Sequence, residues 1–255
     1  MKIFKHLLGI ALCALTTLPL SAEGKQVPNL SFDNWNKKSG TWYPYAENAT
    51  EAQKAWDTAN PGLSVLSMNC TTPEYEHVAV AGKGKAAARI ESKSVFGTFV
   101  AGNLFTGKFL GVVKLSGAKL NFGIPFSDRP KSLSGWYHYV PQPINNVKKP
   151  HKDLKGTLDK GSLEFVLSDR DEPLFINTTK GNYSDSENDP HTIAYGKLIW
   201  GKDSGDYRRF ELNLDYRDDR TPKYLILILT SSIYGGDYTG GTGSVLYVDE
   251  FQLNY

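Results

Sequence analysis

Hydrophobic and polar residues alternate one by one in several short stretches of the chain, as they do in strands with one buried face. Large apolar side chains occupy every second position in residues 120–126, 163–167 and 210–216. A fourth stretch, residues 224–228, is apolar at every position, and Pro222 and Gly235 bound it. The first three predict half-buried antiparallel strands, and the fourth predicts a central strand that is covered on both faces.

The segments between these strands favour an all-β fold. Turn residues are frequent, with 24 Gly and 13 Pro in the chain, and only residues 49–58 predict a helix, of about three turns. Three polar stretches are expected to be long loops, where binding sites usually lie: residues 36–60, 141–157 and 177–192. Because strands and helices do not alternate, we expect a two-sheet antiparallel β-sandwich. It should be a jelly roll with long loops and at most one short helix.

The first 22 residues have the features of a secretory signal peptide. Lys2 and Lys5 form a positive start, residues 7–15 form an apolar core, and small residues end the segment at Ala22. The core is too short for the roughly 20 residues that span a bilayer. We therefore expect cleavage near Ala22 and a protein that is secreted, periplasmic or at the cell surface, with a retained membrane anchor as the alternative. No later segment is apolar for long enough to form a transmembrane span.

Removal of residues 1–22 would change the charge and the cysteine content. The whole chain has a formal net charge of +2, and the two lysines of the signal peptide account for it. A neutral mature protein has no electrostatic surface for phosphate backbones, which argues against nucleic acid as a partner. Cys13 lies in the signal peptide, where lipid attachment is a further alternative, so Cys70 has no partner for an internal disulfide. We expect residues 23–255 to form a single jelly-roll domain with Cys70 buried in it.

Five segments, taken in their order and spacing, resemble one known family. They are residues 30–35 (LSFDNW), 56–60 (WDTAN), 97–109 (GTFVAGNLFTGKF), 123–139 and 243–251. The family is the putative carbohydrate metabolism domain, a group of secreted bacterial jelly-roll domains, and the resemblance extends over about residues 28–255. It implies a β-sandwich similar to carbohydrate-binding modules and to some glycan-active enzymes. The resemblance does not imply catalysis.

Aromatic side chains are the first candidates for binding a saccharide. The apolar C–H faces of sugar rings stack on flat, rigid rings that lose little entropy on binding. On one expected strand, Trp136 and His138 face one way, and Tyr137 and Tyr139 face the other. One of these pairs is expected to lie on the exposed face, and the alternative is that both pack in the core. In the first long loop, the candidate stacking residues are Trp42, Tyr43 and Tyr45.

Asp128 and Arg129 form a second candidate group for substrate binding. Arg presents a planar fork that suits vicinal hydroxyls or a sugar carboxylate. Pro130 restricts the backbone of Arg129 to an extended conformation. A structural ion pair with Asp128 or another carboxylate is the alternative.

Asp249 stands out among the acids because it shares the parity of a mainly apolar face near the end of the chain. A buried charge needs a cation, an Arg partner or hydrogen bonds. Jelly rolls that bind glycans often join their first and last strands with a structural calcium ion, and Asp33 is the natural second ligand here. The expected function requires no cofactor, but a structural calcium ion at Asp33 and Asp249 is one prediction. Hydrogen bonding to backbone or to an Arg is the alternative.

Catalysis would need further groups. A glycosidase uses two carboxylates about 5–10 Å apart, and the candidates at polar strand positions are Glu164, Glu211 and Asp215. Acids on such a face are usually solvated surface. A polysaccharide lyase instead needs a base beside a charge-neutralising arginine, and the loosely fitting candidates are His138, Tyr139 and Arg129.

Three hypotheses of function follow. The first is a secreted carbohydrate-binding domain that captures a polysaccharide or oligosaccharide by stacking on Trp and Tyr, with Arg129 reading hydroxyls or a carboxylate. The second is a glycoside hydrolase or polysaccharide lyase on the same fold. The third is a structural or adhesive surface protein whose aromatic residues only pack.

Overall fold

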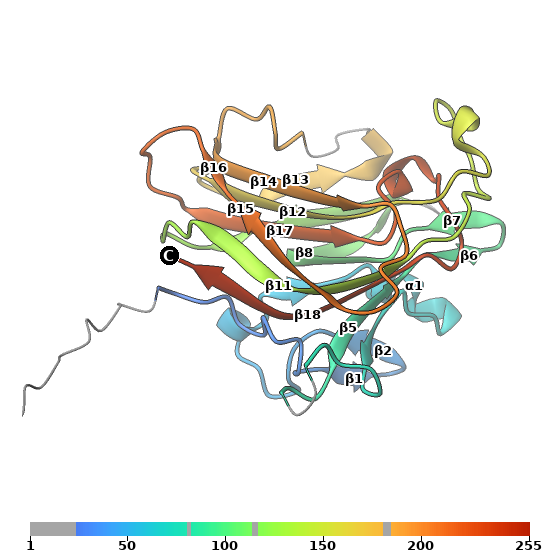
Figure 1. The fold of residues 1–255 in the computed structure, drawn as a ribbon, viewed down its shortest axis with the longest axis horizontal. Helices are drawn as coiled ribbons and strands as arrows, with labels where there is room; N and C mark the ends of the chain where they lie inside the picture. Colours follow the sequence, from blue (N-terminus) through green and yellow to red (C-terminus); the bar gives the residue numbers. More distant parts are fainter. Residues whose placement is uncertain (1–23, 81–82, 114–116, 181–184) are drawn as a thin grey trace, which may run out of the picture.

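The computed structural model describes residues 24–80, 83–113, 117–180 and 185–255. In this part of the chain, two antiparallel sheets pack on each other, with two small hairpins beside them (Figure 1). The expected all-β jelly roll is confirmed. The expected signal peptide, residues 1–22, lies outside the described residues and stays a prediction. Within the described ranges, no helix has the length and apolarity that crossing a bilayer requires.

The larger sheet has nine strands in the described residues, in the order β13-β9-β8-β17-β12-β14-β16, with β3 paired to β8 and β10 to β17. The stretch 224–228 begins its central strand, β17, as its apolar sequence predicted. The strands are β3 (Trp56–Asp57), β8 (Asn103–Val113), β9 (Gly117–Phe122), β10 (Ile124–Pro125), β12 (Gly161–Ser168), β13 (Leu174–Asn177), β14 (Thr192–Trp200), β16 (Asp215–Tyr216) and β17 (Tyr224–Thr230).

The smaller sheet has five strands in the described part of the chain, in the order β15-β11-β18-β5-β4. They are β4 (Thr71–Glu74), β5 (Ala87–Glu91), β11 (Ser132–Val140), β15 (Arg208–Asn213) and β18 (Val245–Asn254). The two hairpins are formed by β1 (Asn36–Lys38) with β2 (Thr41–Tyr43), and by β6 (Lys93–Val95) with β7 (Thr98–Val100).

Helical structure is confined to single turns. The described residues contain one α-helix, α1 (Asn60–Leu63), and 3-10 turns that include η1 (Glu51–Gln53). The predicted helix over residues 49–58 is wrong, because Trp56 and Asp57 form β3 and pair with β8. Trp56 is buried in the core, and its indole N–H donates a hydrogen bond to the Pro28 carbonyl at 2.9 Å. Core burial and strand pairing thus override the local helical propensity.

The core between the sheets contains the apolar positions that the alternation predicted in residues 163–167 and 210–216. In the stretch 120–126, predicted as one strand, the chain is divided between β9 and β10, and Leu120 and Phe122 pack in the cluster on the outer face of the larger sheet instead. Three residues of β12 and two of β15 point into the core: Leu163, Phe165, Leu167, Phe210 and Leu212. Fully burying a side chain of this size contributes about 1.5–3 kcal/mol. Cys70 is buried without a disulfide partner, as expected, so stability rests on this packing.

The stretch 210–216, predicted as one strand, is divided between the two sheets. Strand β15 pairs with β11 in the smaller sheet, whereas β16 pairs with β14 in the larger sheet. The chain crosses between the sheets at Leu214, whose side chain packs against the core. The crossing places Glu211 and Asp215 on different sheets.

The opposite face of the larger sheet carries a second hydrophobic cluster. Val166 and Ile226 alternate with core residues along β12 and β17, so their side chains lie on the outer face. They are buried together with Phe105, Phe122 and Ile176. The central strands of this sheet are therefore covered on both faces, as the uninterrupted apolar stretch predicted.

Candidate functional site

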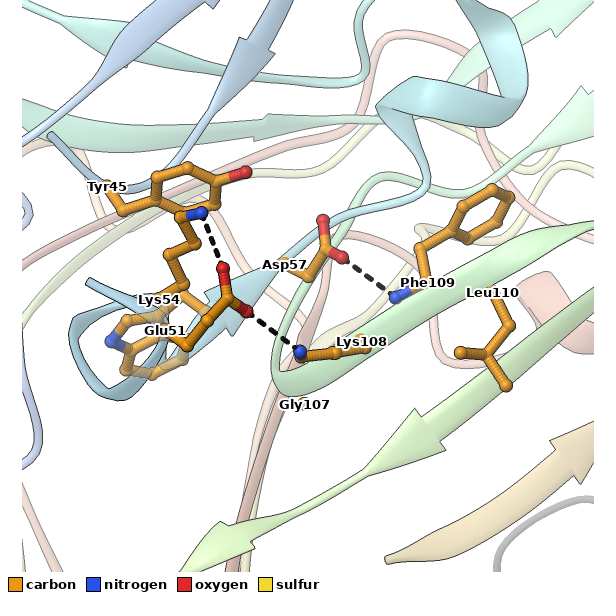
Figure 2. Close-up of a pocket in the computed structure, with 9 residues that line it drawn as sticks. Tyr45, Glu51, Lys54, Asp57, Gly107, Lys108, Phe109 and Leu110 are labelled. Carbon is orange, nitrogen blue, oxygen red and sulfur yellow. Dashed lines mark hydrogen bonds and ion pairs between the residues drawn. The ribbon is translucent and has the colours of Figure 1, made fainter. Parts of the chain in front are cut away.

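A cleft of about 230 Å³ opens where β3 meets β8, and we call it the β3–β8 cleft (Figure 2). Strand β3 pairs with β8 in an antiparallel register, with Asp57 opposite Phe105. The segment between β2 and β3 contributes the remaining side chains. The residues that line the cleft are Tyr45, Glu51, Lys54, Trp56, Asp57, Gly107, Lys108, Phe109 and Leu110.

Glycine at position 107 allows β8 to approach its neighbours beside the cleft. Its φ is 137°, a conformation that L side chains rarely adopt. A Cβ there would overlap the carbonyl oxygen of Asn121 on β9. The Gly107 N–H also donates a hydrogen bond to the Ala55 carbonyl at 3.0 Å, which joins β8 to the segment that leads into β3.

Asp57 is an acid of the cleft with a strongly perturbed pKa. Its Oδ2 accepts a hydrogen bond from the Phe109 N–H at 2.8 Å, and its Oδ1 accepts one from the Thr58 N–H at 2.8 Å. Burial raises the pKa of Asp57 to about 6, against the lowering effects of these two amides and of the Lys108 charge. A carboxyl group with this pKa can gain or lose a proton near neutral pH.

Glu51 lines the same cleft in opposite surroundings. Its Oε1 lies 2.7 Å from the Lys54 Nζ, and its Oε2 lies 3.1 Å from the Lys108 Nζ. Hydrogen bonds from Lys54 and then from Lys108 lower the pKa of Glu51, so its carboxylate stays ionised. Because the side chain is exposed, these ion pairs contribute little to folding stability. Their effect is to orient the carboxylate at the rim of the cleft (Figure 2).

The Tyr45 ring forms one wall of the cleft. The centroid of the Tyr45 ring lies 5.7 Å from the centroid of the Tyr43 ring and 5.6 Å from the Lys54 Nζ. Burial, followed by the charges of Asp57, Tyr43 and Glu51, raises the pKa of Tyr45 to about 12. The phenol therefore stays protonated and offers a hydrogen-bond donor at the cleft.

The Phe109 ring lies on the other side of Asp57 (Figure 2). It is half-buried and packs against the second hydrophobic cluster, so the cleft continues into the outer face of the larger sheet. A Cβ at Gly62 would lie 3.0 Å from the Phe109 Cζ, which shows that α1 lies close to the ring. Leu110, the next residue, is 48% exposed. This side of the cleft is thus apolar.

The predicted stacking residues of the first long loop divide between two faces. Tyr43 contacts the Tyr45 ring and so lies beside the cleft. Trp42 precedes it in β2 and faces the opposite way. The Lys37 Nζ lies 5.2 Å from the Trp42 ring centroid. Trp42 and Tyr43 are both half-buried.

Strand β11 separates its four predicted residues as the alternation required. Tyr139 is fully buried, and Tyr137 stacks on Trp200 with centroids 4.5 Å apart and planes at 19°. These two rings pack in or against the core, which removes them from the candidate binding residues. Trp136 and His138 lie on the outer face of the smaller sheet.

Trp136 is half-buried on this outer face, between β15 and β18. Arg209 is its cross-strand partner on one side and Asp249 on the other. Across the described ranges, its side chain makes no hydrogen bond and no contact with another aromatic ring. Trp136 is therefore a second candidate for stacking on a sugar ring.

His138 belongs to a packed group of rings. It stacks on Tyr247 with centroids 5.4 Å apart, and it lies 5.8 Å from His77 and 5.9 Å from Tyr207. Its Nδ1 is buried without a hydrogen-bond partner among the described residues. Burial lowers the pKa of His138, so the imidazole is held neutral. The ring is enclosed by its neighbours rather than presented to a ligand.

Arg129 and Asp128 bind other parts of the chain. The Arg129 guanidinium donates hydrogen bonds to backbone carbonyls in the loop 218–220 and lies over the Tyr216 ring, 4.2 Å from its centroid. Asp128 accepts a hydrogen bond from the Lys25 N–H at 2.9 Å. Arg129 is thus engaged by carbonyls, a structural role that differs from the ion pair considered for it.

Asp249 is buried, but not on the apolar face that its parity predicted. It lies opposite Trp136 on the outer face of the smaller sheet, whereas Phe251 packs in the core, because Glu250 with a φ of 50° interrupts the alternation between them. Backbone amides satisfy its carboxylate. It accepts hydrogen bonds from the N–H groups of Ala79 at 2.9 Å and Glu250 at 2.8 Å. Burial, together with the charges of Glu250 and Asp33, raises the pKa of Asp249 to about 6, against the lowering effect of the two amides. Asp33 in turn accepts a hydrogen bond from the Ala86 N–H at 3.1 Å. Among the described residues, no group of three or more His, Cys, Asp or Glu is placed to hold a metal ion.

The three carboxylates predicted for catalysis do not share one face. Glu164 lies on β12 in the larger sheet, 3.4 Å from the Lys197 Nζ. Glu211 lies on β15 in the smaller sheet and accepts a hydrogen bond from the Ser132 hydroxyl at 2.8 Å. Asp215 lies on β16, which again belongs to the larger sheet. Any pair that includes Glu211 is therefore separated by the sandwich.

The residues considered for a lyase are also apart. Tyr139 and His138 face opposite sides of β11, and Tyr139 is fully buried. Arg129 is held by loop carbonyls beside β16. These positions do not bring a base next to an arginine.

Sequence reasoning missed the acids of the cleft. Glu51 and Asp57 lie in the polar stretch 36–60, which was expected to carry a site, but both fell within the predicted helix. One signal was present, since residues 56–60 form one of the five segments that carry the family resemblance. The resemblance marks the segment without giving its acid a role.

Comparisons with known proteins agree with this architecture. The family model described as "putative carbohydrate metabolism domain" matches residues 31–254. The chain belongs to this family. No curated protein matches the chain in sequence.

Two solved structures share the fold of this family member. A putative glycoside hydrolase from Bacteroides thetaiotaomicron is 19% identical, with a TM-score of 0.66 over 89% of this chain and 70% of that chain. A putative glycoside hydrolase from Bacteroides vulgatus is 17% identical, with a TM-score of 0.63 over 90% of this chain and 99% of that chain. At these identities the likeness shows the fold alone.

Proposed function

We propose that this carbohydrate-related domain binds an oligosaccharide or polysaccharide in the β3–β8 cleft. The observation that carries the proposal is the composition of the cleft. Aromatic rings, Tyr45 and Phe109, stand on either side of charged groups that can accept or donate hydrogen bonds (Figure 2). Sugar rings need both kinds of contact, because their C–H faces are apolar and their edges carry hydroxyls.

The family supports a saccharide as the ligand class, since its description concerns carbohydrate metabolism. The two hydrolase-like structures with the same fold agree with this choice. We further propose that the protein acts outside the cytoplasm, where polymeric glycans are met, after removal of residues 1–22. Detection of the mature N-terminus in the exported fraction would test this location.

Binding to a panel of soluble polysaccharides tests the proposed site. Suitable probes are a β-glucan, a xylan, a mannan, a galactan, an arabinan and a pectin, measured by affinity electrophoresis and calorimetry. Tyr45→Ala removes one wall and should weaken binding about tenfold, roughly the value of one stacked ring. Trp136→Ala tests the competing surface, because it removes a ring from the outer face of the smaller sheet.

Trp136 also defines the second candidate surface, because its half-buried indole has no ring or hydrogen-bond contact in the described part of the chain. If Trp136→Ala weakens binding and Tyr45→Ala does not, the ligand lies on the outer face of the smaller sheet and the cleft proposal fails. If the wild-type protein binds none of the probes, the structural or adhesive alternative replaces both.

A structural calcium ion at Asp33 and Asp249 stays a prediction. The proximity of the acids supports it, because the charge of Asp33 raises the pKa of Asp249. The backbone hydrogen bonds to both carboxylates support the alternative. Bound calcium at 100 times its Kd would stabilise the fold by about 2.7 kcal/mol, which a melting curve with calcium and with chelator would detect.

A further inference from the structure

We propose that the β3–β8 cleft hydrolyses a glycosidic bond, with Asp57 as the proton donor and Glu51 as the base that activates water. This inference rests on the proposed function, because it requires a saccharide in the cleft. It goes beyond binding by giving two side chains chemical roles.

Asp57 is placed and prepared to donate a proton. The amides of Phe109 and Thr58 fix both oxygens of its carboxyl group, so the group cannot rotate freely. Lys108 faces it from β8 and Tyr45 from the segment after β2. Burial outweighs the lysine and keeps the pKa of Asp57 near 6, so much of the group is protonated in mildly acidic solution.

Glu51 is prepared for the opposite role. Lys54 and Lys108 contact its two oxygens separately, and both lower its pKa. The carboxylate is ionised and reaches water, as a general base must. Two carboxyl groups in one site whose surroundings push their pKa values apart are the arrangement by which enzymes divide the roles of acid and base.

Asp57 and Glu51 both lie near the Tyr45 side chain in the cleft. Asp57 and Glu51 come from different elements, β3 and η1, yet the charges of both raise the pKa of the Tyr45 hydroxyl. Both side chains line the same cleft (Figure 2). A sugar stacked against Tyr45 would therefore have one acid and one carboxylate near its ring, which is what two-carboxylate hydrolysis requires.

The proposed step is a hydrolysis with water as the only co-reactant. Asp57 gives its proton to the glycosidic oxygen, and the bond between that oxygen and the anomeric carbon breaks with its electron pair on the oxygen. Water forms the new bond to the anomeric carbon while Glu51 takes its proton. Glu51 then releases a proton to solvent and Asp57 takes one up, so no net charge or redox change remains.

Release of reducing ends from the same six polysaccharides tests the inference, with binding measured in parallel. Asp57→Asn and Glu51→Gln should each lower the rate at least 100-fold while leaving affinity within about threefold. The matched control is Glu172→Gln, an exposed acid outside the cleft. Circular dichroism melting of each variant separates lost chemistry from lost folding.

The pH profile gives a second readout. The wild-type rate should fall as the pH rises above about 6, because Asp57 loses the proton that it must donate. Binding without release of reducing ends would overturn the inference and leave the proposed function standing. Equal rates for wild type, Asp57→Asn and Glu51→Gln would overturn the assignment of these acids. Absence of any binding would overturn the proposed function and the inference together.

Discussion

Burial raises the pKa of both Asp57 and Asp159, yet the surroundings of these two carboxyl groups differ. Asp159 is fully buried and accepts hydrogen bonds from the Ser232 hydroxyl at 2.8 Å, the Gly241 N–H at 2.7 Å and the Ser244 hydroxyl at 3.1 Å. Asp57 accepts hydrogen bonds from two backbone amides and borders an open cleft. Protein donors surround the first carboxyl group, whereas the second keeps acceptor sites for a ligand.

The difference shows that a raised pKa does not by itself mark a functional site. Asp159 joins the loop before β12 to the loop before β18, and its hydrogen bonds are part of the fold. Asp57 accepts hydrogen bonds that join β3 to β8, but its carboxyl oxygens can still accept hydrogen bonds from a ligand or exchange a proton. We therefore expect substitutions at the two positions to separate stability from activity.

The largest effect on stability is expected for Asp159→Ala. The change leaves the buried donors of Ser232, Ser244 and Gly241 without their acceptor, which should cost about 3–5 kcal/mol. Urea unfolding at pH 7 measures the loss, and Asp153→Ala, at an exposed position, is the matched control. A loss below about 1 kcal/mol would remove the contrast between the two regions.

A smaller effect, with a dependence on pH, is expected for Asp57→Asn. The pKa of Asp57 is about 6 in the folded protein and its ordinary value is 3.8, so between these values the folded state retains a proton that the unfolded state has lost. The wild type therefore loses stability as the pH rises from 4 to 6, and the variant lacks this titration. The difference in unfolding free energy should shift in favour of the variant by at most about 3 kcal/mol.

Urea unfolding of both proteins at pH 4, 5, 6 and 7 measures this difference. A difference that stays constant over the series would mean that Asp57 titrates alike in the folded and unfolded states. The site would then resemble an ordinary surface acid and not a partly buried one.

The smallest effect is expected for Ser244→Ala, which removes one donor from Asp159 and the acceptor of the Gln142 N–H but leaves the other donors of Asp159 in place. The two lost hydrogen bonds should together cost about 1–2 kcal/mol. Thermal melting checks it, with Ser94→Ala at an exposed position of β6 as the control. A cost equal to that of Asp159→Ala would show that the network depends on a single contact.

The sheets could be predicted from the sequence because their signal is local. Leu163, Phe165 and Leu167 mark a buried face by position alone, and the structure confirms it. The division of β11 into an outward and an inward set followed from the same period of two. The sequence could not show which set is exposed, because that depends on what packs against Tyr139.

The site could not be predicted because its contacts are distant in sequence. Asp57 accepts a hydrogen bond from the N–H of Phe109, 52 residues later in the chain. The strand pairing that brings the two residues together cannot be seen in either segment alone. The partners of Arg129 could not be predicted for the same reason, since they are backbone carbonyls about 90 residues away and carry no side-chain signature. The residues around Trp56 favour a helix by their sequence. Trp56 belongs to a strand because its ring is buried in the core, which the local sequence does not show.

The position of β18 has a consequence for how the protein is made. This last strand of ten residues lies in the middle of the smaller sheet, and its Phe251 N–H donates a hydrogen bond to the Leu30 carbonyl at 2.9 Å. A chain that emerges from a ribosome or a translocation channel with its first residues ahead cannot close this sheet until residues 245–254 have followed. Truncation before Val245 should therefore abolish the whole domain, and the emerging chain needs protection from aggregation until β18 arrives.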